Sequence, residues 1–549
     1  MKQSHSPARL LPHALLALSL ASCATQSGAE RSTPSSTPLS TPGETMDRAP
    51  RASPAVKGTP GAAGIGDELF PTAGNGGYDV QTVELSIAMD KVGGPIEATA
   101  KLRAKATQDL SSFDLDLHGL DVRSVEVDGA AATFTRVEDE LVITPANALA
   151  NGSEFTTLVR YGGTPEGVDE PALFGIKVGW MTKDEEVYVF SQPTGAKSFM
   201  PCNDHPRDKA LYTLSITAPK PAKAVCNGTL AETIDVGDKR TFVYRPRDPM
   251  ASYLVTIAIA EFVESERAGP GGLEIRNYFS PKSRQADRDG FDRTDEIVKF
   301  LGEKFGPYPF ETCGNILACI NVPGALETQT IPIYGAGISG ASIICHEQAH
   351  QWFGDAVSVE NWRDIWLNEG FAEYASWMYL EASEGRPAFD TKVKRQYGAQ
   401  RTQSDRRAAA SRELADGSTK PKPPLEPPAR PSSKSMFGSV VYIRGALALD
   451  ALRTEVGDDA FLGLLRTWVT QNANGNATVE EFLAHVENST TKTARTMLEH
   501  WILDEEMPHI AALDEQLAKD KAERDAKRKA RDAQKKKDAE EPEPEKKDG

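Results

Sequence analysis

The sequence predicts an α+β multidomain protein, in which an all-β N-terminal domain precedes a mainly helical domain. Short runs of alternating apolar residues, separated by Gly, Asn and Asp turns, follow one another over residues 73–263, which is the pattern of a domain built from short strands. Helical periodicity replaces this alternation from residue 264 onward. A His-Glu-x-x-His motif then lies within the helical part, at residues 346–350.

The composition limits the classes of function. A chain of 549 residues with 39% hydrophobic residues is long and apolar enough for packed cores, and this length predicts about two to four domains. The formal net charge of −17 argues against nucleic acid or an anionic membrane surface as a partner, because both are negatively charged themselves.

The first 22 residues resemble an export signal. A basic start precedes an apolar run that is too short to span a membrane, and the run ends at Leu-Ala-Ser-Cys23. This ending resembles a bacterial lipoprotein signal, so we expect a lipidated Cys23 that anchors the mature chain in the cell envelope. Ala24 indicates the outer membrane, if the cell has two membranes. Ordinary secretion with a coincidental cysteine is the alternative.

Polar segments flank the expected domains. Residues 23–72 are rich in Ser, Thr, Pro and Gly, and we expect a disordered tether there because such a composition buries too little apolar surface. Residues 511–549 alternate basic and acidic residues and contain few apolar ones, which predicts a solvated helix or disorder rather than a further domain.

Individual strands and helices can be placed approximately. The β domain, residues 73–263, is expected to hold strands near 80–87, 113–117, 122–127, 141–144, 188–191, 210–218, 239–245 and 252–260. The helical domain, residues 264–510, is expected to hold strands at 273–279 and 315–320, and helices at 287–305, 364–382, 440–456, 459–471 and 479–487. A loop rich in Pro and charge interrupts the helices at 417–434.

Five cysteines follow Cys23, and an odd number leaves at least one free thiol. Cys313 and Cys319 are close enough in sequence to form a disulfide in an oxidising compartment, and two buried thiols are the open alternative. The sequence has no Cys-x-x-Cys pair, which argues against a second, structural zinc site.

The His-Glu-x-x-His motif predicts a zinc site. Residues four apart lie on one face of a helix, so His346 and His350 can direct both imidazoles to one ion. Glu369 follows His350 by 19 residues and would complete the two-histidine, one-glutamate set of a catalytic zinc, with one position open for water. Glu347 is placed to accept the proton of that water. An ordinary amphipathic helix with two polar histidines is the alternative.

Four stretches of the chain resemble the gluzincin zinc aminopeptidases, typified by aminopeptidase N and leukotriene-A hydrolase. They are Gly-Ala-Leu-Glu-Thr at 324–328, the segment 346–373 with Trp-Leu-Asn-Glu-Gly-Phe-Ala-Glu, Gln-Pro at 192–193 with Pro-Cys-x-Asp at 201–204, and Tyr-Ile-Arg-Gly at 442–445. The resemblance covers about residues 75–508. It implies a saddle-like β domain before a thermolysin-like catalytic domain, in a short bacterial lipoprotein member that lacks the large C-terminal helical domain of many relatives.

The resemblance also implies roles for single residues. Tyr442 would be catalytic, and its hydroxyl is a donor suited to a tetrahedral oxyanion. Glu327 would bind the free α-amine of the substrate, with Gln192 beside it. Gly324 and Ala325 would lie on the same strand edge and contact the substrate.

The chain departs from the family pattern Gly-x-Met-Glu-Asn at Leu326 and Thr328. Leucine is close to methionine in size and polarity, whereas threonine cannot supply an amide contact. The leading hypothesis is therefore an aminopeptidase with one zinc ion, which acts on peptides that have a free N-terminus. A zinc endopeptidase is the alternative within enzymes, and a catalytically inert envelope binding protein is the alternative from another class.

Overall fold

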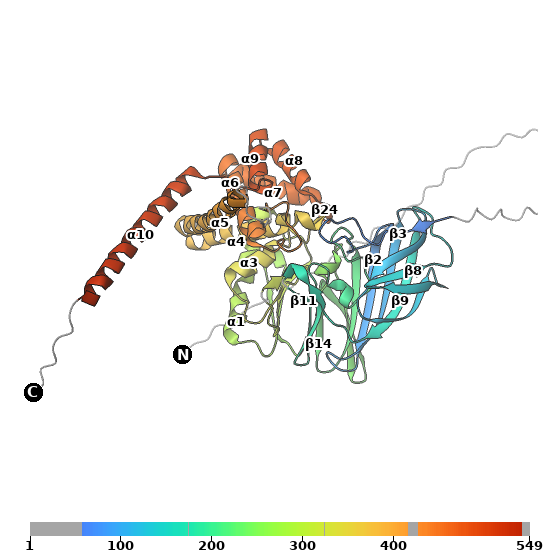
Figure 1. Cartoon of the computed structure of the whole chain (residues 1–549). Coiled ribbons are helices and arrows are strands. Elements are labelled where there is room, and N and C mark those ends of the chain that lie inside the picture. The colour runs from blue at the N-terminus through green and yellow to red at the C-terminus, as the bar shows by residue number, and fades with distance from the viewer. Residues whose placement is uncertain (1–56, 174, 323, 415–425, 541–549) are drawn as a thin grey trace, which may run out of the picture. The chain divides into compact units, whose positions relative to one another are not determined.

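The computed structural model describes residues 57–173, 175–322, 324–414 and 426–540 (Figure 1). The expected export signal, Cys23 and most of the predicted tether lie outside these residues. Among the helices of the described ranges, none combines the length and the apolar character that a membrane span requires.

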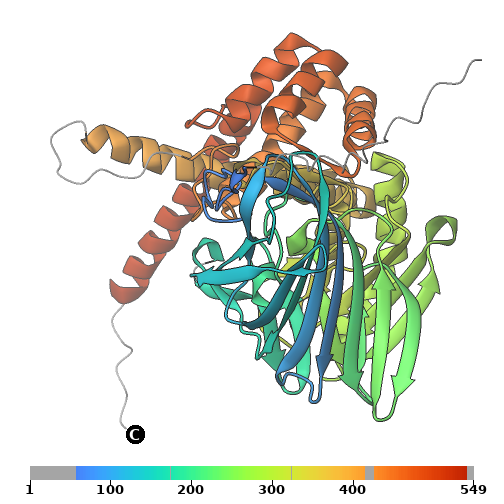
Figure 2. The same ribbon diagram turned by 90° about the vertical axis from the view of Figure 1, so that its right-hand side faces the viewer.

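An eight-stranded sheet is the largest sheet of the β-rich N-terminal region (Figure 2). Along β2 (Tyr78–Met89), Val83, Leu85 and Ile87 are buried, whereas the residues between them are exposed. This alternation is that of a strand with one face on a core. The sheet order is β15-β16-β13-β2-β3-β9-β5-β6. The other strands are β3 (Ile96–Ala106), β5 (Asp121–Val127), β6 (Ala130–Ala131), β9 (Glu154–Gly163), β13 (Leu211–Pro219), β15 (Thr229–Val236) and β16 (Lys239–Arg245).

Two smaller sheets complete this region. One has the order β1-β4-β8-β7, and the other has the order β10-β11-β12-β17-β14. All five residues of β12 are buried, because the strand lies between β11 and β17 inside its sheet. The strands are β1 (Thr59–Pro60), β4 (Leu110–Asp116), β7 (Thr133–Val137), β8 (Glu140–Thr144), β10 (Val168–Glu170), β11 (Ile176–Lys183), β12 (Glu186–Phe190), β14 (Lys223–Cys226) and β17 (Ile257–Ala260).

The second region combines a five-stranded sheet with a group of helices, which Figure 1 shows in yellow to red. The sheet order is β18-β19-β20-β22-β21, so that β21 (Ala325–Leu326) lies at an edge and pairs antiparallel with β22. The expected α+β class is therefore confirmed. The remaining strands are β18 (Val263–Ala268), β19 (Glu274–Phe279), β20 (Thr312–Leu317) and β22 (Ile333–Tyr334), and the helices include α2 (Thr294–Phe305), α3 (Ala341–Ala349), α4 (Trp366–Glu384), α6 (Gly445–Val456), α7 (Asp458–Asn472), α8 (Val479–Ser489) and α9 (Lys492–Ile502).

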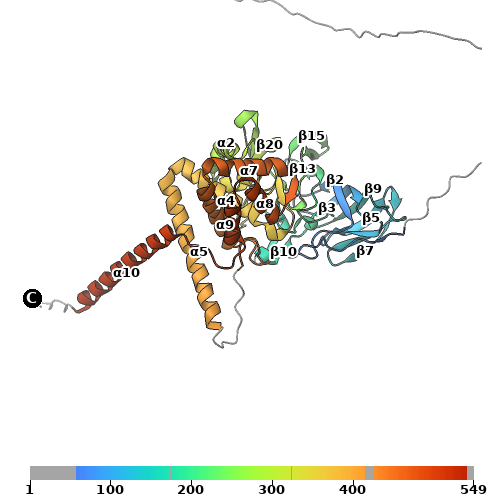
Figure 3. The same ribbon diagram turned by 90° about the horizontal axis from the view of Figure 1, so that it is seen from above.

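Two long helices lie in parts of the chain where the sequence predicted no helix or left helix and disorder as alternatives (Figure 3). Helix α5 (Arg386–Leu414) is not among the helices predicted from the sequence, because few apolar residues mark its helical period. Within 511–549, α10 (Ala511–Glu540) is a helix. Its first turns pack on α5, where Tyr397 donates to Asp514 over 2.8 Å and Lys394 pairs with Asp520 at 2.6 Å.

The predicted tether is wrong for residues 57–72, which belong to the folded structure. Backbone pairing holds β1 to β4, and buried polar contacts hold the rest. The Asp67 carboxylate accepts from the backbone N–H of Trp362 at 2.7 Å and lies 3.2 Å from Nε2 of His205. The Phe70 ring packs edge-on against Trp362. Composition missed this order because hydrogen bonds, rather than a run of apolar residues, stabilise the segment.

The cysteine alternative is also settled. Cys313 and Cys319 are both free thiols, so they form no disulfide; Cys313 is buried and Cys319 half-buried. The Cys313 thiol donates to Oε1 of Gln348 at 3.2 Å.

Candidate active site

Two helices bring the three predicted metal ligands together. His346 lies on α3 and His350 at its C-terminal end, whereas Glu369 lies in the first turn of α4. Oε2 of Glu369 is 3.2 Å from Nε2 of His346 and 3.3 Å from Nε2 of His350, and the three ligand atoms all lie within 4.8 Å of one another. Two imidazole nitrogens and one carboxylate oxygen at this spacing fit a catalytic zinc.

Local hydrogen bonding prepares His350 to bind a metal. Its Nδ1 lies 2.9 Å from the carbonyl oxygen of Phe353, so that Nδ1 carries the proton and Nε2 keeps its lone pair toward Glu369. Gly354 allows Nδ1 of His350 to come this close to the carbonyl oxygen of Phe353. Its φ of 138° is rarely adopted by other residues, and a Cβ there would lie 3.3 Å from Nδ1 of His350.

Glu373 is a further residue of the site, and no motif in the sequence predicts a role for it. Its Oε2 lies 3.7 Å from Nδ1 of His346, while its Oε1 accepts from Nε1 of Trp377 at 2.7 Å and lies 3.4 Å from Nζ of Lys392. A carboxylate behind a ligating histidine orients the ring and raises its basicity. Its position could have indicated this role, because Glu373 lies one helical turn after Glu369 and therefore on the same face of α4.

Glu347 and Tyr442 border the three ligands. Burial raises the pKa of Glu347 to about 7, a value at which a carboxyl group can both accept and return a proton near neutral pH. The Tyr442 ring stacks on His346, with 5.8 Å between ring centroids and 9° between ring planes. Burial raises the pKa of Tyr442 well above its usual value, so its hydroxyl remains protonated and can donate a hydrogen bond.

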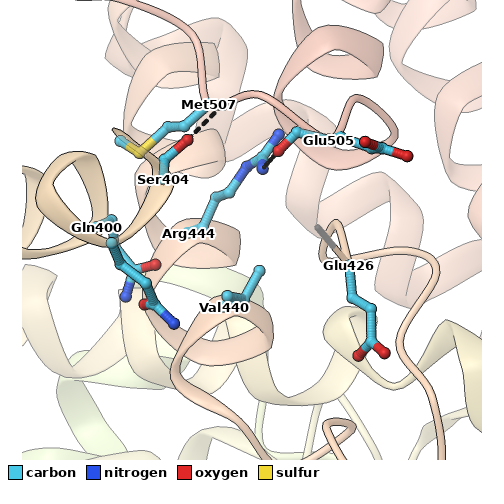
Figure 4. A pocket seen from close by; sticks show the side chains of 8 residues that line it. Gln400, Ser404, Glu426, Val440, Arg444, Glu505 and Met507 are labelled. Carbon is cyan, nitrogen blue, oxygen red and sulfur yellow. Dashed lines mark hydrogen bonds between the residues drawn. The ribbon is translucent and has the colours of Figure 1, made fainter. Parts of the chain in front are cut away.

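A turn of π-helix at Val440–Arg444 carries Tyr442. Two residues later, Arg444 is 4% exposed and donates to the backbone carbonyl oxygens of Trp501 at 2.8 Å, Asp504 at 2.6 Å and Glu505 at 3.1 Å. Figure 4 shows this side chain reaching the chain that carries Glu505. The arginine therefore joins the turn that bears Tyr442 to the segment that follows α9.

The predicted amine-binding residues meet at the same place. Nε2 of Gln192, which follows β12, donates to Oε1 of Glu327, which follows β21, at 2.7 Å. Burial raises the pKa of Glu327 above its usual value. Next to the predicted zinc ligand His350, Gln351 donates from Nε2 to the backbone carbonyl of Glu327 at 3.2 Å, which ties this strand edge to the end of α3.

Thr328, where the chain leaves the family pattern, has a local role. Its hydroxyl donates to the carbonyl oxygen of Ile331 at 2.7 Å, and the N–H of Ile331 donates to the carbonyl oxygen of Thr328 at 3.0 Å. Threonine thus closes the turn that follows Glu327, and the side chain is fully buried.

All of the predicted site residues within the described ranges line one cavity of about 430 Å³. The cavity is also bordered by Glu373 and by the first turn of α3. The predicted residues on it are Gln192, Gly324, Ala325, Glu327, His346, Glu347, His350, Glu369 and Tyr442.

A buried zinc-binding triad with an adjacent carboxyl base defines the class of zinc-dependent hydrolases. Residues 78–254 match the peptidase M1 N-terminal domain, and residues 337–501 match the peptidase family M1 domain. The chain belongs to peptidase family M1, and zinc is the cofactor that this family implies for the three ligands.

Curated relatives and solved structures agree with this assignment. Aminopeptidase A of Gloydius brevicauda is 27% identical over 328 residues, which are 56% of this chain and 33% of that protein. Leukotriene A-4 hydrolase of Xenopus laevis is 26% identical over 437 residues, which are 74% of this chain and 67% of that protein. An M1 zinc metallopeptidase from Deinococcus radiodurans has a TM-score of 0.72 at 27% identity, over 81% of this chain and 98% of that one. The chain spans about a third to a half of the length of the first two curated relatives it matches.

Proposed function

We propose that this protein is a zinc-dependent aminopeptidase, which removes N-terminal residues from peptides. The observation that carries the proposal is the hydrogen-bonded pair of Gln192 and Glu327, which borders the same cavity as the zinc-binding triad. An ammonium group offers several N–H donors and a positive charge, and a buried carboxylate with an adjacent amide oxygen is a suitable partner for it. Holding that amine restricts cleavage to the first peptide bond.

The mechanism follows from the groups around the cavity. Zinc, when bound by His346, His350 and Glu369, supplies a Lewis acid that polarises the scissile carbonyl and makes water more acidic. Glu347 accepts the proton of the attacking water and returns it to the leaving amine. The Tyr442 hydroxyl donates to the developing oxyanion, a type of interaction worth about 3 kcal/mol.

The test compares aminoacyl-anilides and short peptides that carry a free or an acetylated N-terminus. We expect hydrolysis only with a free amine, loss of hydrolysis with a chelator, and a loss of about a hundredfold or more in kcat for Glu347→Gln. Glu303→Gln is the matched control, because Glu303 is an exposed carboxylate on α2. Equal cleavage of free and acetylated peptides would favour an endopeptidase. Full activity of Glu347→Gln, or no hydrolysis of any substrate, would refute the enzymatic proposal.

We propose, further, that Cys23 anchors the mature chain to a bacterial membrane. The support is the basic and apolar start of the sequence and its ending in Leu-Ala-Ser-Cys23. We expect the wild-type protein in the membrane pellet of fractionated cells and the Cys23→Ala variant to be absent from it. Equal recovery of both proteins in the soluble fraction would contradict the anchor.

A further inference from the structure

A second, mostly apolar cavity of about 460 Å³ opens beside the catalytic cavity. The two cavities share Gln192, Gly324, Ala325 and Tyr442 as lining residues. The shared wall therefore includes one member of the amine-binding pair, and the second cavity begins next to the site where the amine is expected.

Apolar side chains from several elements build this second cavity. Met181 comes from β11, Phe190 from β12, Leu326 from β21, and Val322 from the loop before it. These four residues belong to one apolar cluster, in which Phe190 and Leu326 are buried. Phe437 contributes from the chain just before the π-helical turn. Walls formed by sheet residues that also pack on a core keep their positions when a ligand enters.

Charge is confined to the rim. Lys177 is the one charged side chain among the described residues that line the cavity, and it is exposed on β11. A cationic side chain entering here would be repelled by this ammonium. An anionic side chain could pair with it only at the exposed rim, and deeper in the cavity it would lose its hydration against the apolar walls.

The geometry points to a substrate class: this site takes peptides whose N-terminal residue has a large apolar side chain, such as Leu, Met or Phe. The amine and the side chain of an amino acid branch from the same Cα atom. When Glu327 and Gln192 hold the amine, the side chain of that same residue lies within reach of the cavity that shares Gln192 and Ala325. This inference rests on the proposed aminopeptidase function and specifies its substrate.

The expected selectivity follows from burial in the cavity. Each additional buried methylene improves kcat/KM by about tenfold in a well-fitting apolar pocket, so leucyl and phenylalanyl substrates should exceed alanyl ones by at least about tenfold. Glutamyl and arginyl substrates should fall below leucyl ones by about a hundredfold, because their charges are desolvated without a buried partner.

The test measures kcat/KM for leucyl, phenylalanyl, alanyl, glutamyl and arginyl anilides with the full-length protein. Met181→Glu places a charge on the apolar wall and should lower the leucyl to alanyl ratio by about tenfold or more, whereas Met181→Leu should keep that ratio. Thr182→Glu is the matched control, because it adds the same charge at the next, exposed position of β11, which does not border the cavity. An unchanged ratio in Met181→Glu, or glutamyl or arginyl substrates better than leucyl ones, would overturn the inference.

A second readout does not depend on turnover. In the zinc-loaded Glu347→Gln protein, calorimetry should show L-phenylalanine binding at least about tenfold more tightly than L-glutamate or L-alanine. Dipeptides with Leu and Ala in either order separate the two positions of the cleaved bond. If the preference follows the second residue instead of the first, this cavity does not hold the side chain of the N-terminal residue. The proposed aminopeptidase function would be unaffected by that result. Absence of hydrolysis with every free-amine substrate would overturn both.

Discussion

Replacing Arg444 by Met tests whether this buried arginine positions the turn that bears Tyr442. Burial lowers the pKa of Arg444 to about 10, so the guanidinium is charged at neutral pH. It donates to three backbone carbonyl oxygens between residues 501 and 505 at 3.1 Å or less. Methionine retains much of the volume and none of the donors. Each carbonyl that loses its partner costs about 1 kcal/mol or more, so we expect a loss of about 3 kcal/mol in the free energy of unfolding.

The assay combines urea unfolding, followed by tryptophan fluorescence, with steady-state kinetics. Because Tyr442 lies two residues before Arg444, kcat should also fall, by about tenfold or more, with little change in KM. Arg466→Met is the matched control. Arg466 also donates to backbone carbonyl oxygens, those of Glu303 and Lys304, but it is exposed. Its loss should cost less than about 1 kcal/mol. Unchanged unfolding of Arg444→Met, or lost stability with full kcat, would refute the reasoning.

Three further predictions follow from the site and its surroundings. Glu373→Gln weakens the support of His346 and should lower zinc affinity by about ten- to a hundredfold, as measured by competition with a chromophoric chelator; equal affinity would show that Glu373 is structural only. Gly354→Ala places a Cβ against His350 at a φ of 138° and should lower the free energy of unfolding by about 1–3 kcal/mol, which thermal denaturation would detect. The hydrogen bonds of Asp67 to Trp362 and His205 offset its burial and lower its pKa to about 2. This carboxylate therefore stabilises the fold above pH 4, and its contribution is lost as pH falls from about 4 to 2. Asp67→Asn should be less stable than wild type at pH 6 and lose less on acidification, and parallel pH profiles would contradict this.

The predicted metal-binding helix, α3, was predictable because the motif that marks it lies within one short stretch of the sequence. His346 and His350 lie one turn apart on one helix, and Glu369 follows at a spacing that a second helix satisfies. The pairing of Gln192 with Glu327 was predicted only through the resemblance, since no periodicity connects residues 135 positions apart. Glu373 was missed because a carboxylate on a helix is usually solvated, and only the fold shows that its oxygen approaches Nδ1 of His346.

Polar and tertiary contacts account for the other differences. Helix α5 has few apolar residues, and its buried ones, Phe389, Val393 and Tyr397, are too sparse to mark a helix without the helices that they contact. Residues 57–72 look like a linker by composition, yet Asp67 is buried with backbone and histidine partners. The link between Arg444 and Tyr442 also depends on the path of residues 500–506, which sequence spacing does not define.

The bond between Gln192 and Glu327 has a consequence for how such an enzyme can change over evolution. The groups proposed to perform the chemistry come from α3, α4 and the π-helical turn, whereas Gln192 and part of the apolar wall, including Met181 and Phe190, belong to the β-rich region. If the proposed selectivity holds, substitutions around β11 and β12 alter which N-terminus is accepted while the proposed hydrolytic groups stay intact. On this proposal, selectivity and reactivity depend largely on different stretches of the chain, which are joined by the hydrogen bond between Gln192 and Glu327 and by the residues that line both cavities.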